Sequence, residues 1–166
     1  MYFSYYESPL GRMLLGGTEE GLSGLWISEQ KYYAATMDEE MTQRDDLPLF
    51  EQTKKWLDRY FNKEQPDPKE LKLDPKGTDF RKTVWDILLK IPYGRTTSYG
   101  AIAKSITESR KGRKTSARAV GGAVGHNPIS IIIPCHRVVG SDGSLTGFAS
   151  GLDKKVWLLQ HEDVIL

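Results

Sequence analysis

This chain has very little cysteine and no long apolar run, and both shortages limit what it can be. Cys135 is the single cysteine among 166 residues, so no internal disulfide can form. The sequence has no CxxC and no paired-histidine spacing, which excludes the common zinc sites. Its longest apolar runs, such as residues 131–133, are far too short to cross a bilayer, and the N-terminus lacks the pattern of a signal peptide. We therefore expect a soluble intracellular protein.

The net charge is close to zero, but the charges are unevenly distributed. Residues 1–75 hold 9 Lys/Arg and 15 Asp/Glu, whereas residues 76–166 hold 14 and 7. Between Arg95 and Arg118, seven basic residues accompany one acid, Glu108. A charge run is most often a solvated surface, yet this segregation also suits a polyanionic partner on the C-terminal side.

The first 75 residues predict a small sheet followed by a helix. Residues 1–27 contain short β-forming segments separated by turns, which indicates a hairpin or three-stranded meander. Residues 28–45 are polar and give no clear signal. Asp46 is expected to cap a helix over residues 47–61, with Pro48 in its first turn. A charged, proline-bearing connection follows, and we place the boundary between two domains, 1–75 and 76–166, within it.

Residues 76–166 predict four helices and one buried strand. Thr78 should cap the first helix, which stops at Pro92-Tyr93-Gly94, and the second should run from about Ser98 to Ile106. After a polar connection over 107–114, Ser116 should cap a third helix over 117–125, which Asn127-Pro128 ends. The apolar run 131–134 is expected to be a buried strand that reaches Cys135, and Asp153 is expected to open the last helix.

Cys135 is followed directly by His136 in the segment IIIPCHRVVG, residues 131–140. A reactive cysteine needs a base or a positive field, because the thiolate is the nucleophile. His136 is the candidate base, although neighbouring side chains of an extended chain point to opposite faces, so it should reach the sulfur only through a water or a local bend. Glu162 is the candidate carboxylate that orients the histidine, and Arg137 adds positive field. A buried structural thiol is the alternative.

The helix expected over residues 117–125, ARAVGGAVG, contains three glycines. Each costs about 1 kcal/mol relative to alanine inside a helix, so a reason for keeping them is required. Small side chains allow close approach either to another helix or to a DNA groove. Arg118 is its one long polar side chain, which favours weakly sequence-specific binding, in the minor groove, over reading of base edges.

Three segments, IIIPCHRVVG, ARAVGGAVGHNP and GLDKKVWLLQHE, together resemble the O6-alkylguanine-DNA alkyltransferases, also called methylated-DNA–protein-cysteine methyltransferases. The resemblance is dense over about residues 77–166 and general before them. It implies an α+β fold, with a ribonuclease H-like sheet-and-helix domain and a mainly helical domain that carries a winged-helix-like helix-turn-helix. It also implies DNA repair, in which an O6-alkylguanine (chiefly O6-methylguanine, with O4-methylthymine as a second lesion) is flipped out and its alkyl group moves irreversibly to the cysteine.

The resemblance assigns a role to each matching residue. The catalytic set comprises the alkyl acceptor Cys135, the water-mediated base His136, its carboxylate partner Glu162, the proton donor Tyr99, and Asn127, which ties the recognition helix to the active-site strand. Arg118 is expected to fill the gap that the flipped base leaves. The other DNA contacts are Arg95, Thr97, Ser116, Ala117, Ala119, Gly121 and Gly122, and the base pocket is lined by Val138, Gly147, Phe148, Ala149 and Ser150.

The same resemblance implies a monomer that binds double-stranded DNA and needs no metal, cofactor or membrane. It would act in the cytoplasm, on the nucleoid in a prokaryote, or in the nucleus of a eukaryote. Two segments depart from the family pattern. The connection over 107–115 exceeds the usual three or four residues, and its ESRKGR stretch either adds phosphate contacts or is a solvated loop. Residues 148–150 leave the accepted size of the alkyl group open.

Two other functions fit parts of the sequence. One is an alkyltransferase-like protein that senses the lesion without transfer, but such proteins lack the acceptor cysteine that is present here. The other is a Cys-His hydrolase, which would need an oxyanion hole and repeated turnover, and which leaves the basic, glycine-rich helix without a purpose. Ester turnover by Cys135 would distinguish the hydrolase from a single-use acceptor.

Overall fold

The chain folds into two compact units, which we describe from a computed structural model covering residues 1–37, 40–111 and 113–166. The first unit comprises residues 1–77 and 128–132, and the second comprises residues 78–127 and 133–166. Gly112, inside the connection expected over 107–114, lies outside the described residues. Within the described ranges, no helix is long and apolar enough to cross a membrane.

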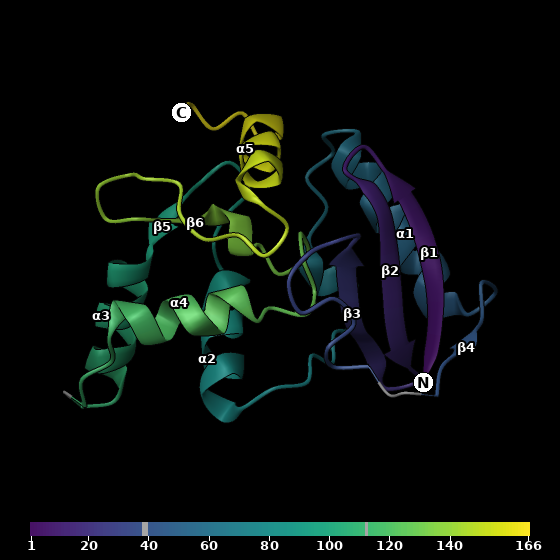
Figure 1. The fold of residues 1–166 in the computed structure, drawn as a ribbon, viewed down its shortest axis with the longest axis horizontal. Helices are drawn as coiled ribbons and strands as arrows, with labels where there is room; N and C mark the ends of the chain where they lie inside the picture. The colour runs from purple at the N-terminus through teal and green to yellow at the C-terminus, as the bar shows by residue number, and fades with distance from the viewer. Residues whose placement is uncertain (38–39, 112) are drawn as a thin grey trace. The chain divides into compact units, whose positions relative to one another are not determined.

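The first unit is built on a four-stranded sheet in the order β3-β2-β1-β4 (Figure 1). Its strands are β1 (Tyr2–Ser8), β2 (Gly11–Thr18), β3 (Gly21–Ile27) and β4 (Thr42–Gln43). The first three form the predicted antiparallel meander, and Gly11 permits the first turn because its φ is 105°. The short β4 pairs in parallel with the start of β1, inside the segment that gave no sequence signal.

Helix α1 (Pro48–Phe61) packs its apolar stripe in the core of this unit. Phe50, Leu57 and Tyr60 are each at most 1% exposed, as their helical spacing predicts. The expected cap is wrong by one residue: Leu47 is the N-cap, and Asp46 pairs with Arg44 instead, with 3.0 Å between Nε and Oδ1.

The outer edge of β3 is covered by a segment from far along the chain. Leu25 donates a backbone hydrogen bond to the Pro128 carbonyl (2.8 Å) and accepts one from the Ser130 amide (3.1 Å). All seven residues of β3 are consequently buried. Residues 128–132 are thereby part of the first unit, and the Cys135 segment follows directly after them in the chain.

The second unit consists mainly of four helices. These are α2 (Asp79–Leu88), α3 (Tyr99–Ser109), α4 (Ala117–Gly125) and α5 (Leu152–His161). The predicted N-caps Thr78 and Ser116 are confirmed, and Ser98 caps α3 in the same way: each hydroxyl accepts a hydrogen bond from the amide three residues later, at 3.0–3.2 Å. The second unit also contains the 3-10 turn Cys135–Arg137 and the strands β5 (Thr97–Ser98) and β6 (Val138–Val139), whereas the 3-10 turn Pro68–Glu70 belongs to the first unit.

Three predicted boundaries in this unit need correction. Helix α2 ends at Leu88 and does not continue to Pro92, because the chain leaves the helix in a turn in which the amides of Lys90 and Ile91 donate to the carbonyls of Ile87 and Leu88. Helix α3 continues to Ser109 instead of stopping near Ile106, so the connection to α4 begins about three residues later than expected. Helix α5 begins at Leu152, and its N-cap is Gly151, whose φ of 99° suits glycine, whereas Asp153 lies in the first turn. All three differences have one cause: helix ends depend on tertiary contacts as well as on capping residues, so the sequence locates them only to within a few residues.

Candidate active site around Cys135

Cys135 begins a 3-10 turn rather than ending a strand. The expected strand over residues 131–134 is wrong: Ile131 has a φ of 72°, and the Cys135 amide donates to the Ile133 carbonyl at 2.8 Å. A 3-10 helix has about three residues per turn, so Cys135 and His136 do not point to opposite faces as they would in an extended chain. The backbone at Cys135 and His136 is therefore bent and not extended.

Asn127 links the end of helix α4 to the cysteine segment. Its Nδ2 donates to the Ile133 carbonyl at 2.8 Å, and its side chain is hydrogen-bonded to the Cys135 sulfur. Asn127 is only 4% exposed, so both bonds form away from water and are worth more there than at the surface. Helix α4 is held in turn by α2, because Trp85 Nε1 donates to the Ala123 carbonyl at 2.9 Å.

His136, Glu162 and Arg137 form one buried polar cluster. His136 Nε2 lies 2.5 Å from Glu162 Oε2, and neither side chain is exposed. The Arg137 guanidinium binds both oxygens of the same carboxylate, with Nε 2.7 Å from Oε1 and Nη2 3.2 Å from Oε2. The Gly94 amide donates to Oε1 at 3.1 Å, and Arg137 Nη1 donates to the Ile91 carbonyl at 2.7 Å. The structure brings together the histidine and carboxylate that the sequence paired.

The surroundings of this cluster decide its protonation. Burial alone would raise the pKa of the Glu162 carboxyl, but the hydrogen bonds and charges of His136 and Arg137 outweigh it and hold the pKa below its ordinary value. Burial lowers the pKa of His136. A neutral imidazole beside a carboxylate must carry its hydrogen on Nε2, so Nδ1 keeps the lone pair. Nδ1 is buried and has no hydrogen-bond partner among the described residues, which leaves it able to accept a proton.

Cys135 itself is held as a thiol. Burial raises its pKa, while the hydrogen bond from Asn127 and the positive charge of Lys155 act against that effect. Its side chain is nearly enclosed, with the residue 6% exposed. A thiol of this kind needs a base before it can react as a nucleophile, and His136 Nδ1 is the candidate base in this unit.

Tyr99 is brought to the same site by a two-residue parallel pairing. Thr97 pairs with Val138 and Ser98 with Val139, so the start of helix α3 lies beside the residues that follow Cys135. Tyr99 Oη donates to the carbonyls of Thr146 (3.0 Å) and Gly147 (3.4 Å). Burial raises the pKa of Tyr99, and the electrostatic effect of Cys135 raises it further. The phenol therefore keeps its proton at neutral pH.

The structure also places the remaining predicted residues. Val138 is fully buried beside the site, Ser150 is 9% exposed, and Gly147 lies under the Tyr99 hydroxyl. Ser116, Ala117, Arg118, Ala119 and Gly122 are exposed on α4, Gly121 and Thr97 are half-buried, and Arg95 is exposed. Phe148 and Ala149 are half-buried in the loop that contacts Tyr99. Arg118 and Gly122, which are four residues apart, therefore share one exposed side of α4, and Ala117 and Ala119 are exposed beside Arg118 in its first turn.

Lys155 is a site residue that the sequence interpretation missed. Its side chain is fully buried, and its Nζ donates to the carbonyls of Val138 (2.6 Å) and Thr146 (3.0 Å). A signal was available, because Lys155 lies three and four residues before the buried Leu158 and Leu159 and so shares their face of α5. The neighbouring Lys154 concealed that signal, since paired lysines usually mark a solvated face.

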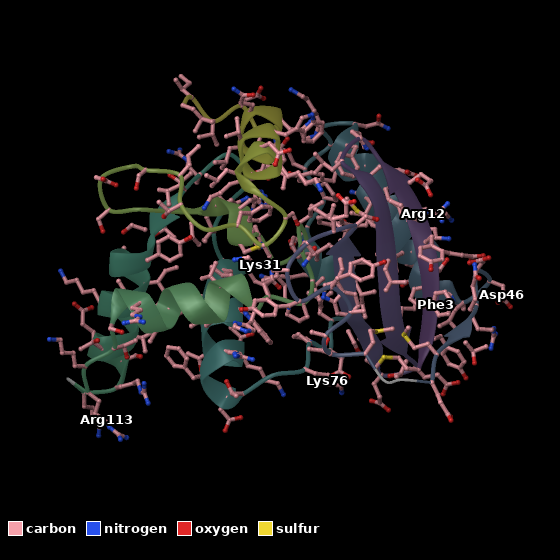
Figure 2. The ribbon with its side chains drawn as sticks, in the orientation of Figure 1. Phe3, Arg12, Lys31, Asp46, Lys76 and Arg113 are labelled. Carbon is pink, nitrogen blue, oxygen red and sulfur yellow. The ribbon has the colours of Figure 1, made fainter. Side chains whose placement is uncertain are left out.

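The connection between α3 and α4 presents its basic side chains to solvent. Arg110, Lys111, Arg113 and Lys114 are all exposed. Arg113 lies at the outer tip of the connection in Figure 2. Arg110 Nη1 reaches Thr115 Oγ1 at 3.4 Å, and the Thr115 amide donates to Thr107 Oγ1 at 2.9 Å, so the two ends of the connection are tied together.

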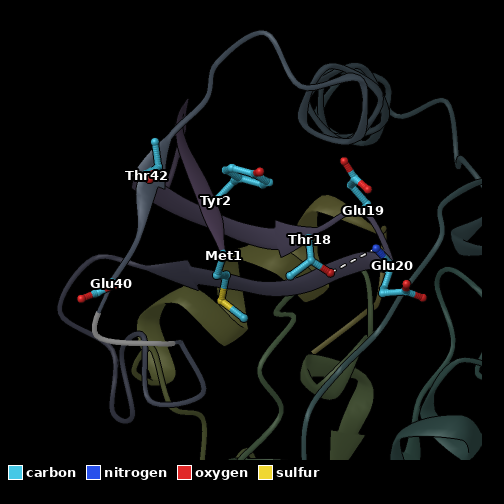
Figure 3. A pocket seen from close by; sticks show the side chains of 7 residues that line it. All are labelled: Met1, Tyr2, Thr18, Glu19, Glu20, Glu40 and Thr42. Carbon is cyan, nitrogen blue, oxygen red and sulfur yellow. Dashed lines mark hydrogen bonds between the residues drawn. The ribbon is translucent and has the colours of Figure 1, made fainter.

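A cavity of about 620 Å³ lies in the first unit and contains none of these site residues (Figure 3). Its lining is Met1, Tyr2, Thr18, Glu19, Glu20, Glu40 and Thr42. Three carboxylates at its rim make it unsuited to a nucleic acid. Among the described residues, no group of three or more His, Cys, Asp or Glu side chains could hold a metal ion.

The second unit thus holds a nearly enclosed thiol, a buried histidine–carboxylate pair and a protonated tyrosine, a set of groups typical of proteins that use cysteine as a nucleophile. Comparison with known proteins then gives the family. Residues 1–75 match the family domain described as "6-O-methylguanine DNA methyltransferase, ribonuclease-like domain", and residues 79–164 match "6-O-methylguanine DNA methyltransferase, DNA binding domain".

Whole-chain relatives agree with the domain matches. The methylated-DNA–protein-cysteine methyltransferase of Methanosarcina barkeri is 45% identical over 164 residues, which is 98% of each chain. That of Haemophilus influenzae is 40% identical over 99% of this chain and 87% of its own. The crystal structure of Mycobacterium tuberculosis OGT in complex with DNA superimposes with a TM-score of 0.83 at 41% identity, covering 98% of this chain and 92% of that one. The chain belongs to the 6-O-methylguanine DNA methyltransferase family, as its three motif segments predicted, and the expected α+β fold is confirmed.

Proposed function

We propose that this protein repairs alkylated DNA by moving the alkyl group from O6 of a flipped guanine to the Cys135 sulfur, once per molecule. The observation that carries this function is the enclosed Cys135 thiol beside His136, whose Nε2 is fixed by Glu162 and whose Nδ1 is free. The family membership of both halves of the chain supports the same reaction.

The first step removes the thiol proton. His136 Nδ1 takes that proton through one water, and Glu162 stabilises the imidazolium that results. Glu162 is well suited to this because Arg137 and the Gly94 amide keep it ionised and in place. The thiolate is generated only when needed, which agrees with the raised pKa of the resting thiol.

The second step is displacement at the alkyl carbon. The sulfur–carbon bond forms as the carbon–O6 bond breaks, and the electron pair of the broken bond passes into the guanine ring. Tyr99 donates its phenolic proton toward the ring, so the base leaves neutral, and the imidazolium proton restores the phenol through solvent. Overall the thiol loses one proton and guanine gains one. The new thioether has no route to hydrolysis, so each molecule acts once.

Helix α4 is the element that would meet the DNA. Its exposed start, with Arg118 among small residues, can approach the duplex closely, and the Arg118 side chain can occupy the space left by the flipped base. Flipping costs a few kcal/mol of unstacking, which an inserted side chain partly recovers. The exposed N-terminal amides of α4 and the basic connection before it add favourable contacts to phosphates.

The rest of the assignment follows from the same reaction. Residues 76–166 carry the chemistry and the DNA contacts, and residues 1–75 support the fold. The substrate is duplex DNA with an O6-alkylguanine, and O4-methylthymine is a second substrate. The protein acts as a monomer, without a metal or other cofactor, in the compartment that holds the genome.

Mass spectrometry after mixing the protein with a duplex that bears one O6-methylguanine tests this function. One added methyl group on Cys135, with no more than one per chain, is the expected result. The Cys135→Ala variant should gain none while retaining lesion binding. Tight binding by the native chain without an adduct, or repeated turnover of a thiol-reactive ester, would instead indicate a lesion sensor or a hydrolase.

A further inference from the structure

The segment that leads into Cys135 begins with a strained turn. The Ile132 amide donates to the Ser130 carbonyl at 2.8 Å, and Ile131 between them has a φ of 72°. This combination is the classic γ-turn, which is rare, and a β-branched residue at its centre is unfavourable. Strain of this kind persists only where the surrounding structure holds the backbone in place, and it is concentrated at functional sites.

A second tight turn follows at once and ends at the nucleophile. The Cys135 amide donates to the Ile133 carbonyl, and Pro134 has a φ of −82° and a ψ of 65°, which is the inverse γ-turn. Each γ-turn bends the chain within three residues, so the two turns together set the direction in which the backbone enters Cys135. Residues 128–134, here called the cysteine strap, therefore need a fixed anchor before the first turn.

Contacts within the first unit provide that anchor. The backbone of Pro128 and Ser130 pairs with Leu25 of β3. Gln30, shortly after β3, adds a side-chain contact, because its Oε1 accepts from the Ile27 amide at 2.7 Å and from the Ser130 hydroxyl at 3.4 Å. Gln30 is 6% exposed and Ser130 is 2% exposed, so these bonds form away from water. Ser130, the first residue of the strained turn, is thus held by its backbone and by its side chain.

The other end of the cysteine strap is held within the second unit, where Asn127 Nδ2 donates to the Ile133 carbonyl. The strained turn at Ile131 therefore lies between two anchors. A backbone held away from its preferred conformation relaxes when an anchor is weakened, and the chain that follows it then moves. The anchor that Gln30 supplies thus bears on where the Cys135 thiol lies.

We propose that Gln30 is a positioning residue for alkyl transfer: through Ser130 it fixes the start of the γ-turn at Ile131, and so the direction in which the chain enters Cys135. The inference rests on the proposed function and goes beyond it, because it gives a residue of the first unit a part in the transfer step. Gln30 is buried, so its loss should slow that step without weakening the binding of DNA.

Single-turnover methyl transfer from a duplex with one O6-methylguanine separates these two quantities. The variants are Gln30→Met, which keeps the length of the side chain but lacks the acceptor oxygen, Ser130→Ala, and the double variant. In Gln30→Met we expect the rate at saturating duplex to fall by up to about 100-fold, since a small displacement of a reacting group is enough for such a loss. The duplex concentration that gives half of the maximal rate should not change. The double variant should be no slower than Gln30→Met, because both changes remove the same contact.

The control is Thr53→Ala, which removes another buried hydrogen bond of the first unit, from Thr53 Oγ1 to the Leu49 carbonyl at 2.8 Å, and should keep the native rate. A folded Gln30→Met variant with the native rate would overturn the proposal. So would a double variant in which the two losses multiply, because Gln30 would then act by a route other than Ser130. If Gln30→Met does not fold, Ser130→Ala leaves the Ile27 amide bonded, and the same change in rate is required of it.

Hydrogen exchange at the Ile132 and Cys135 amides, which close the two γ-turns, provides a measurement without DNA. In Gln30→Met both amides should exchange faster relative to the amides of α1, because the cysteine strap opens locally. Unchanged exchange at both would overturn the proposal. Failure of the native protein to accept a methyl group, together with faster exchange in the variant, would reject the proposed function and leave the anchoring of the cysteine strap standing.

Discussion

At the scale of single residues, Glu162 serves two partners with its two oxygens. His136 and Arg137 both bind it, and all three side chains are buried. Arg137 keeps the carboxylate ionised, and the carboxylate keeps the imidazole hydrogen on Nε2. A histidine held in this way keeps its lone pair on Nδ1, which has no hydrogen-bond partner among the described residues.

This cluster predicts that stability falls on acidification. The pKa of His136 is lowered by burial, so below the ordinary value of 6.5 the unfolded chain binds more protons than the folded one and stability is lost. The pKa of Glu162 is also lowered, so its stabilisation is present above 4.5 and is lost as the pH falls further. Chemical unfolding followed from about pH 7.5 to about pH 4 should show both losses.

The variant His136→Gln tests whether His136 causes the loss of stability at the higher-pH end of that curve. Glutamine cannot titrate, so the loss of stability that begins near the ordinary histidine value should disappear, while the loss below 4.5 remains. An unchanged curve in this variant would show that His136 is not the group responsible.

At the scale of elements, Asn127 connects the end of helix α4 to the segment that carries Cys135. Replacing it with alanine leaves the buried Ile133 carbonyl without its donor and removes the bond to sulfur, so we expect a loss of about 1–3 kcal/mol in the free energy of unfolding. Denaturant titration measures this. Asn62→Ala, at the exposed end of α1, is the control and should lose less than about 0.5 kcal/mol. Equal losses in both variants would contradict the linking role.

The basic connection before α4 predicts a salt-dependent contribution to DNA binding. Changing Arg110, Lys111, Arg113 and Lys114 to alanine should reduce the slope of log K against log salt by up to about 0.9 for each phosphate that is no longer neutralised. Titrations of labelled duplex at several salt concentrations measure that slope. Four exposed lysines of the first unit (Lys31, Lys55, Lys69 and Lys72) provide a matched control, for which the slope should not change. An unchanged slope for the first set would make the connection a solvated loop.

Local signals predicted most elements but not the turn that presents Cys135. Caps such as Thr78 and Ser116 are local hydrogen bonds, so the sequence locates them well. The apolar run before Cys135 has the composition of a buried strand, yet Ile131 adopts a positive φ and the chain turns. Composition cannot distinguish these cases, because the turn depends on pairing with β3, a strand about 100 residues earlier in the chain.

The residues of the candidate site also divide into those that the sequence predicted and those that it did not. The sequence predicted Cys135, His136 and Glu162 as candidates because their side chains carry the required chemistry. The segments that contain them also resemble a known family. Lys155 was not assigned, since which of two adjacent lysines is buried depends on how α5 packs. The bidentate contact of Arg137 with Glu162 likewise requires two segments 25 residues apart to meet.

At the scale of the whole molecule, the first unit is acidic and the second unit is basic. Most of the positive charge lies in the part that carries Cys135, whereas the first unit has an acidic cavity rim and a sheet-and-helix core. We therefore expect changes in the core of the first unit to alter stability without altering the chemistry.

The variant Phe50→Ala tests whether the core of the first unit affects stability alone. Phe50 is fully buried on α1, so its truncation should lower the free energy of unfolding by about 3–5 kcal/mol. The rate of methyl transfer, measured on the folded variant well below its melting temperature, should equal that of the native chain. A lower rate in a fully folded sample would give the first unit a direct part in catalysis.

The single cysteine has a practical consequence for anyone who studies this protein in cells or extracts. Since the reactive sulfur is the only thiol in the chain, a thiol assay in denaturant counts the molecules that have not yet been used. A purified sample thus carries its own record of past repair: total protein minus free thiol equals the number of lesions removed, provided that oxidation is prevented. The state of one sulfur atom reports the history of each molecule.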